Sequence, residues 1–129
     1  MAKPVHVLAI DDEESFTFFV KLNLETKTDD DFKVTTANSG EEGLKLAKAL
    51  RPDLILLDIM MPDMSGAEVA EELLQDTRTK NIPIIFITAL VKKEEVDKES
   101  GLMGGREFIA KPVSKEELIM RIKTTLQLT

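Results

Sequence analysis

The chain has 129 residues, of which 43% are hydrophobic and 32% charged, with no cysteine and a net charge of −7. This length suits one domain over residues 1–129, and the lack of cysteine excludes disulfides and thiolate metal sites. The acidic balance argues against direct nucleic-acid binding, which relies on Lys and Arg. The apolar runs are too short to cross a membrane, and the first residues lack a signal peptide's apolar core, so we expect a cytoplasmic protein.

Five short apolar segments predict β-strands. In chain order they are residues 5–10, 32–37, 54–57, 82–88 and 107–110. Three of these segments are continuously apolar and do not alternate with polar residues. That pattern is typical of parallel strands covered on both faces.

Amphipathic segments between the strands predict helices. Residues 39–42 and 114–117 each place Ser three positions before Glu, as in a capping box at a helix start, and a third apolar stripe begins at Gly66. Residues 15–24 fit a strand or a helix, and we favour a helix because the segment lies between two strands. Residues 91–101 are mostly polar, so we expect a weakly held helix there.

This alternation of strands and helices predicts an α/β fold, a doubly wound parallel sheet of five strands flanked by five helices. Such folds bind ligands at the carboxyl ends of their strands. The chemically notable residues lie at those ends: Asp11, Asp12, Asp58, Thr88 and Lys111. Clustered carboxylates suit a hard cation such as Mg²⁺, and a carboxylate can also act as a nucleophile that forms an aspartyl-phosphate.

The sequence resembles the receiver domain of the response regulator family of two-component signal transduction. Four segments carry the resemblance: "AIDDEES" at 9–15, "PDLILLDIMMPDMSG" at 52–66, "IPIIFITAL" at 82–90 and "GGREFIAKPVSKEEL" at 104–118. Their joint pattern is specific, whereas each segment alone is a weak signal. The resemblance implies a flavodoxin-like receiver fold with the strand order 2-1-3-4-5.

The resemblance also implies roles for the residues at the strand ends. Asp58 would accept a phosphoryl group and would hold Mg²⁺ together with Asp11, Asp12 and the backbone carbonyl of Met60. The protein would thus be a signalling phosphoacceptor and not an enzyme in the usual sense. We also expect slow dephosphorylation, because Met60 and Leu90 cannot orient water well.

On the same resemblance, Thr88 and Lys111 would contact the phosphoryl oxygens. Thr88 and Phe108 would form the conformational switch, although Phe108 also suits a purely packing role. The bond between Lys111 and Pro112 would be cis. His6 lies five residues before Asp11, and we expect it to be structural.

The expected partners are a sensor histidine kinase or a histidine phosphotransfer protein, and a downstream protein or fused output domain. A homodimer formed on phosphorylation is a further expectation, whereas direct nucleic-acid binding and membrane contact are not expected. Two other functions remain open: an interaction module of the same fold that works without phosphate, and an enzyme of the same topology. The intact set of site residues weighs against the module. The lack of a Gly-rich loop after the first strand weighs against a nucleotide-binding enzyme.

Overall fold

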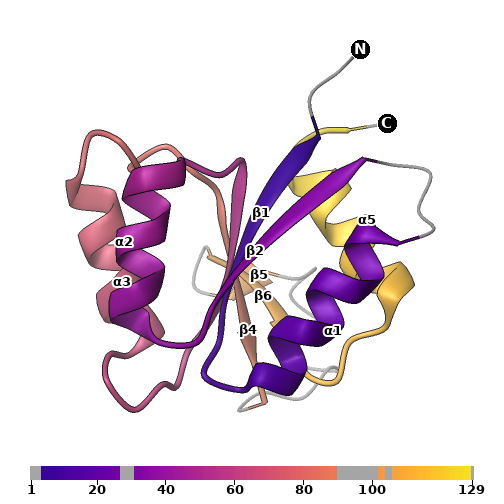
Figure 1. Cartoon of the computed structure of the whole chain (residues 1–129), viewed down its shortest axis with the longest axis horizontal. Helices are drawn as coiled ribbons and strands as arrows, with labels where there is room; N and C mark the ends of the chain where they lie inside the picture. Colours follow the sequence, from indigo (N-terminus) through magenta and orange to yellow (C-terminus); the bar gives the residue numbers. More distant parts are fainter. Residues whose placement is uncertain (1–3, 27–30, 90–101, 104–105, 129) are drawn as a thin grey trace.

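Six strands form one sheet, in the order β2-β1-β3-β4-β6-β5, within the residues described by the computed structural model: 4–26, 31–89, 102–103 and 106–128. The sheet runs through the middle of the molecule, with helices on both sides (Figure 1). The strands are β1 (Val5–Ile10), β2 (Phe32–Ala37), β3 (Leu54–Asp58), β4 (Ile84–Thr88), β5 (Leu102–Met103) and β6 (Arg106–Ala110).

The five predicted strands are parallel and stand in the predicted order, since the predicted fifth strand is β6. β4 begins at Ile84, two residues later than predicted. Pro83 directly before it has no N–H group to donate to a neighbouring strand. Its carbonyl still accepts a hydrogen bond from Ile55 N at 3.0 Å, so the chain enters the sheet at this point.

A strand that was not predicted follows the segment expected to be a weakly held helix, residues 91–101. Leu102 and Met103 form the short strand β5, which pairs antiparallel with β6 through Glu107 and Arg106. This strand is a sixth one beside the five predicted. It adds an antiparallel pair at the edge of a sheet whose other pairs are parallel. A short segment beside an unpaired strand edge can satisfy its backbone groups by pairing there, which periodicity alone does not reveal. The predicted helix, residues 91–101, lies outside the described residues.

The described residues contain four helices, against the five predicted: α1 (Glu14–Glu25), α2 (Gly40–Leu50), α3 (Gly66–Gln75) and α5 (Lys115–Thr125). The ambiguous segment is the helix α1, with Thr17, Val20 and Leu24 on its buried side. Within the described residues, no helix combines the length and the apolar character needed to span a membrane.

The helix starts follow from their capping residues. The hydroxyls of Ser39 and Ser114 accept hydrogen bonds from the N–H groups three residues later, as predicted for α2 and α5. α3 has a full capping box between Ser65 and Glu68, which was not predicted. Each cap satisfies N–H groups that the helix itself leaves unpaired, a contribution of about 1 kcal/mol.

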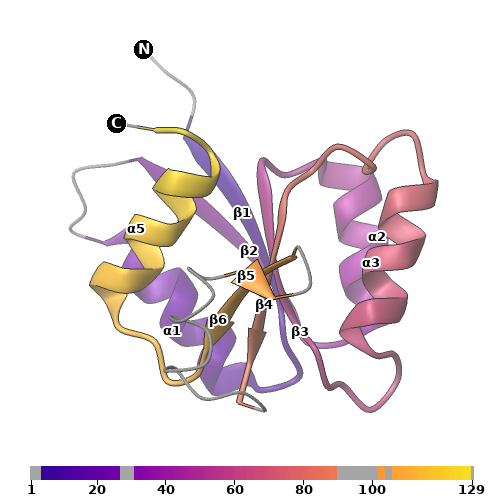
Figure 2. The same ribbon diagram turned by 180° about the vertical axis from the view of Figure 1, so that it is seen from behind.

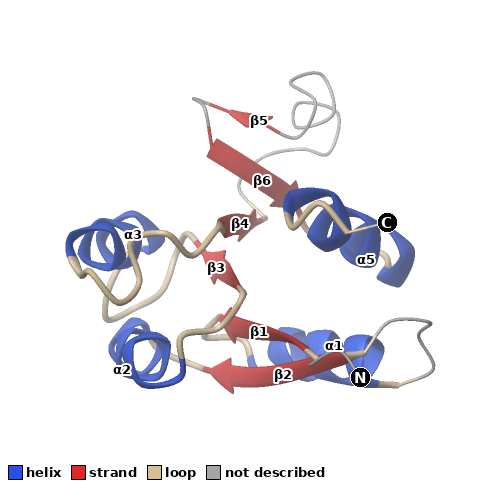
Figure 3. Ribbon diagram, turned by 90° about the horizontal axis from the view of Figure 1, so that it is seen from above, coloured by secondary structure: helices blue, strands red, loops and turns tan. Residues whose placement is uncertain are grey.

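α1 and α5 cover one face of the sheet, and α2 and α3 cover the other (Figures 2 and 3). Two apolar cores result, one on each side of the sheet. β3 supplies both of them, because Leu54 and Leu56 point into one core while Ile55 and Leu57 point into the other. This two-sided burial is why β3 is continuously apolar up to Asp58, and each such side chain contributes about 1.5–3 kcal/mol.

Candidate functional site

Three carboxylates meet at the carboxyl ends of β1 and β3. Asp11 and Asp12 follow β1, and Asp58 is the last residue of β3. One oxygen from each of these residues lies within 4.8 Å of the others. Asp11 and Asp58 are buried, with 1% and 7% of their surface exposed, whereas Asp12 is exposed. The arrangement therefore concentrates negative charge at a place that water reaches from one side only.

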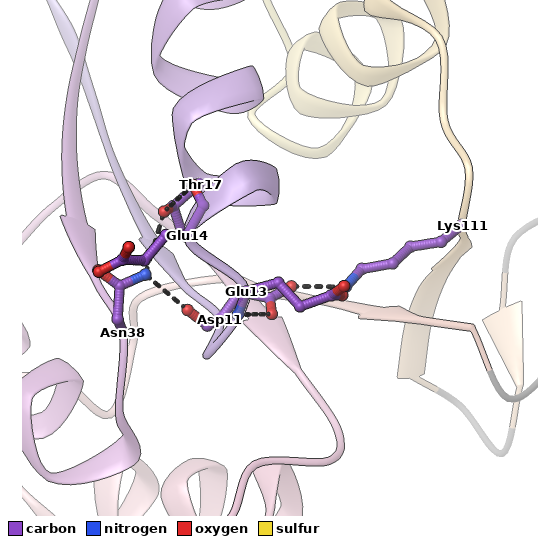
Figure 4. A network of polar contacts seen from close by, with 6 residues as sticks. All are labelled: Asp11, Glu13, Glu14, Thr17, Asn38 and Lys111. Carbon is purple, nitrogen blue, oxygen red and sulfur yellow. Dashed lines mark hydrogen bonds and ion pairs between the residues drawn. The ribbon is translucent and has the colours of Figure 1, made fainter.

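Backbone and side-chain hydrogen bonds hold Asp11 in place (Figure 4). Its N–H donates to the Ala37 carbonyl at 3.0 Å, and its Oδ1 accepts from Glu13 N at 2.9 Å. The side chain of Asn38 donates from Nδ2 to the Asp11 carbonyl at 2.9 Å, and also to Thr17 Oγ1 at 3.1 Å. The first acidic residue is thus fixed by contacts from both β2 and α1.

Lys111 extends from the end of β6 toward Asp11 (Figure 4). Its Nζ lies 2.7 Å from Asp11 Oδ2 and 2.6 Å from Glu13 Oε1, and 4.5 Å from the centre of the Phe16 ring. Burial by itself lowers the pKa of Lys111, but the hydrogen bonds to Asp11 and Glu13 outweigh that effect and raise the pKa above its usual value. The side chain is therefore a charged ammonium group at neutral pH.

Asp58 carries the strongest electrostatic perturbation in the cluster. Burial is the largest cause, and together with the charge of Asp11 it raises the pKa of Asp58 from 3.8 to about 7, although Lys111 opposes the rise. A cation bound in the cluster would stabilise the ionised form of Asp58. Its positive charge would offset both the cost of burying the carboxylate and the repulsion from Asp11.

The residues present fit a hard divalent cation. Asp11 Oδ2 is buried, and its partner among the described residues is the ammonium group of Lys111, whose Nζ lies 2.7 Å away. Three carboxylates offer only oxygen ligands, and Mg²⁺ prefers oxygen ligands and keeps several of its waters. The exposed side at Asp12 leaves room for such waters.

The loop after Asp58 is held close to the end of β3. Gly66 N donates to the Ile59 carbonyl at 2.7 Å, and a Cβ atom on Gly66 would lie 2.4 Å from the Asp58 carbonyl oxygen. Only glycine permits this approach of α3 to the strand. Met60 lies within this loop, and its side chain is 62% exposed.

Thr88 and Lys111 come from neighbouring strands and are joined through the backbone. Thr88 ends β4 and is buried, and its carbonyl accepts a hydrogen bond from Lys111 N at 2.8 Å. In the sheet, Asp58 is in register with Ile87, the residue before Thr88. The peptide bond between Lys111 and Pro112 is cis, as predicted.

Phe108 packs on the face of the sheet that α2 and α3 cover. Its ring is half-buried and stacks on Phe86, with the ring centres 5.2 Å apart, and the Arg106 guanidinium carbon lies 5.6 Å from the Phe86 centre. A packing role is therefore real, and it does not exclude a second role in switching.

His6 lies in β1, and its Nε2 is 2.8 Å from Thr35 Oγ1. This bond agrees with the predicted structural role.

Sequence analysis missed three residues that touch the site region: Glu13, Asn38 and Asp63. Glu13 directly follows Asp11 and Asp12, and this position is the only feature of the sequence that could have pointed to its role. Asn38 and Asp63 act through hydrogen bonds to distant backbone groups, which leave no pattern in the sequence.

Comparisons with known proteins agree with this geometry. Residues 7–123 match the family model described as the response regulator receiver domain. The chain is 42% identical to the alkaline phosphatase synthesis transcriptional regulatory protein PhoP of Bacillus subtilis, over 94% of this chain and 48% of that protein. It is 37% identical to the DNA-binding dual master transcriptional regulator RpaA of Synechocystis, over 95% of this chain and 49% of that protein.

Solved structures show the same fold. The chemotaxis protein CheY4 of Vibrio cholerae has a TM-score of 0.78 at 28% identity, covering 95% of this chain and 98% of that chain. The receiver domain of the Francisella response regulator 1452 has a TM-score of 0.76 at 31% identity, covering 97% of this chain and 98% of that one. These neighbours agree with the predicted flavodoxin-like arrangement.

The partner prediction needs correction. It left nucleic acid out, yet relatives such as RpaA are named as DNA-binding or transcriptional regulators, and the chain spans about half the length of the curated relatives it matches. The acidic charge on which the exclusion rested describes this chain alone and says nothing of such longer proteins. The match over residues 7–123 nevertheless settles the family: the chain belongs to the response regulator receiver domains of two-component signal transduction.

Proposed function

We propose that Asp58 accepts a phosphoryl group in a Mg²⁺-dependent reaction. The observation that carries this proposal is the convergence of a buried carboxylate at the end of β3 with two further carboxylates and the ammonium group of Lys111. A donor phosphohistidine on a sensor kinase or phosphotransfer protein would supply the group. Asp58 Oδ attacks phosphorus, the P–N bond breaks as the P–O bond of an acyl phosphate forms, and the leaving imidazole takes up a proton.

Asp11, Asp12 and Asp58 would hold Mg²⁺, with the Met60 backbone carbonyl as a further ligand. Bound there, the ion offsets negative charge on the transferring phosphoryl group. The protein fixes the positions of these ligands. Three hydrogen bonds hold Asp11, and Asp58 is the last residue of a fully buried strand. Ionised Asp58 is both the ligand and the nucleophile, so ion binding and loss of its proton go together.

Lys111 and Thr88 would bind the oxygens of the transferred group. Lys111 is already a charged ammonium group near Asp58, and it can turn from Asp11 and Glu13 toward the new phosphoryl oxygens. Thr88 brings a hydroxyl from the adjacent strand end. Phosphorylation therefore rearranges contacts at the ends of β4 and β6.

We assign the switch to Thr88 and Phe108, which lie on the paired strands β4 and β6. Movement of Thr88 toward a phosphoryl group would change the space beside β6, and the half-buried ring of Phe108, which stacks on Phe86, would repack in response. The relatives' names favour transcriptional control as the output. Residues 1–129 would act as one receiver unit that is phosphorylated in the cytoplasm.

The proposal is tested by the chemistry of the bound group. Incubation with Mg²⁺ and radiolabelled acetyl phosphate should label the protein, and neutral hydroxylamine should remove the label, because hydroxylamine cleaves acyl phosphates. A label that resists hydroxylamine would point to a phosphoester on a hydroxyl group and would contradict Asp58 as acceptor.

A further inference from the structure

The junction between β2 and α2 contacts both segments that carry the candidate metal ligands. At one end, Asn38 Nδ2 donates to the backbone carbonyl of Asp11 at 2.9 Å (Figure 4). At the other end, Asp63 lies in the loop after Asp58 and accepts hydrogen bonds from Gly40 N and Glu41 N, each at 3.0 Å. Residues 38–41 therefore link the turn after β1 to the loop after β3.

The junction is itself tightly held. Asn38 N donates to Glu42 Oε1 at 2.9 Å, and Glu42 N donates to Ser39 Oγ at 3.1 Å. A Cβ atom on Gly40 would lie 2.8 Å from Met64 Cβ, so the start of α2 rests directly on the loop after β3. A displacement of one end of this short segment is therefore transmitted to the other end.

Mg²⁺ tolerates little variation in the positions of its ligands, whereas clustered carboxylates without a cation repel one another. The hydrogen bonds of Asn38 and Asp63 oppose the separation of the two loops that such repulsion favours. We propose that the β2–α2 junction is a brace that sets the spacing between the Asp11–Asp12 turn and the loop after Asp58. Asn38 and Asp63 are its two positioning residues for Mg²⁺ binding, a role that rests on the proposed function.

The experiment measures Mg²⁺ affinity by isothermal titration calorimetry, since the chain has neither Trp nor Tyr as a fluorescent reporter. The proteins are the wild type, Asn38→Ala, Asp63→Ala and the double variant. Loss of a residue that orients metal ligands typically weakens metal binding by about 10–100-fold, and we expect about tenfold for each single variant. Both contacts are needed for one link between the two loops, so the loss of either contact already breaks it. The double variant should therefore bind Mg²⁺ about as well as either single variant.

Two matched variants separate positioning from charge and from stability. Asp53→Ala makes the same change at the opposite end of β3, where Asp53 Oδ2 accepts a hydrogen bond from His6 N at 2.8 Å, and it should leave Mg²⁺ affinity unchanged. Asp63→Asn removes the charge and keeps one of the two oxygen acceptors, so it should restore part of the affinity lost in Asp63→Ala. Thermal unfolding of each variant confirms that it is folded at the titration temperature.

The outcomes are distinct. Wild-type affinity in both single variants overturns the brace, and so does a double variant whose loss is the product of the two single losses, since that result describes two independent contacts. A loss of Mg²⁺ affinity in Asp53→Ala as large as in Asp63→Ala assigns the effect to charge and also overturns the brace. If the wild type itself binds no Mg²⁺, the proposed function fails together with the brace.

Discussion

Lys111 Nζ lies 2.7 Å from Oδ2 of Asp11, a residue of the candidate metal cluster. The ammonium group and a metal ion would therefore compete for the same carboxylate. Glu13 Oε1 lies 2.6 Å from the same Nζ and gives the ammonium group a second anion when the metal takes Asp11. Lys111 thus has one set of partners before metal and phosphoryl binding and another set afterwards.

Replacement of Lys111 by Met should raise Mg²⁺ affinity several-fold, because it removes a competing positive charge beside Asp11. The same variant should accept phosphoryl groups more slowly, because it lacks the cation that binds the phosphoryl oxygens. Titration calorimetry and phosphorylation kinetics on the same preparation check both effects. A variant with weakened Mg²⁺ binding would show that Lys111 orders the carboxylates and does not compete with the ion.

The raised pKa of Asp58 predicts a pH-dependent stability of the metal-free protein. Well below pH 3.8, folded and unfolded chains both carry the proton, so ionisation of Asp58 has no effect on stability there. As the pH rises to about 7, the unfolded chain releases this proton while the folded chain keeps it, so the folded state loses stability. Above that pH the penalty is constant.

Asp58→Asn removes this penalty. In EDTA, the gain in melting temperature over the wild type should therefore be larger at pH 8 than at pH 5. Mg²⁺ should raise the melting temperature of the wild type more than that of the variant. An equal gain at both pH values would mean that Asp58 has an ordinary pKa in the folded protein.

Gly66→Ala should damage both the fold and the site. The added Cβ would lie 2.4 Å from the Asp58 carbonyl oxygen, and this backbone atom cannot move without shifting the end of β3. We expect a loss of about 1–3 kcal/mol in the free energy of unfolding, as for other overpacked positions. Chemical denaturation measures the loss, and wild-type stability would contradict the close approach of α3 to the strand.

Met60→Asn should speed the loss of the phosphoryl group. The Met60 side chain is 62% exposed, stands two residues after Asp58 and cannot orient an attacking water, whereas an amide can. The rate of label loss after removal of the donor measures the effect. Met120→Asn makes the same change on α5 at a side chain that is 56% exposed, and it should leave the rate unchanged. Leu90, the other residue linked to slow dephosphorylation, lies outside the described residues.

The parallel strands were predictable because burial on both faces requires an unbroken apolar run, as in Leu54–Asp58 up to its last residue. The residues at the strand ends were predictable as well, since parallel strands bring their carboxyl ends to one edge of the sheet. β5 was not predictable, because Leu102–Met103 pairs with a neighbouring edge and has no periodicity of its own.

The supports of the site were also beyond prediction. Asn38 and Asp11 are 27 residues apart, and Asp63 and Gly40 are 23 residues apart. In the first pair the side chain donates to a backbone carbonyl, and in the second it accepts from a backbone N–H, two groups that almost every residue type provides. Only the folded arrangement shows which of these groups are neighbours.

The most direct test of the central claim is the intact mass of the protein after incubation with acetyl phosphate, for the wild type and Asp58→Asn, in Mg²⁺ and in EDTA. We predict the mass of one added phosphoryl group on the wild type in Mg²⁺, and an unchanged mass in EDTA and in the variant. The same added mass on Asp58→Asn, or on the wild type in EDTA, would contradict a Mg²⁺-dependent transfer to Asp58.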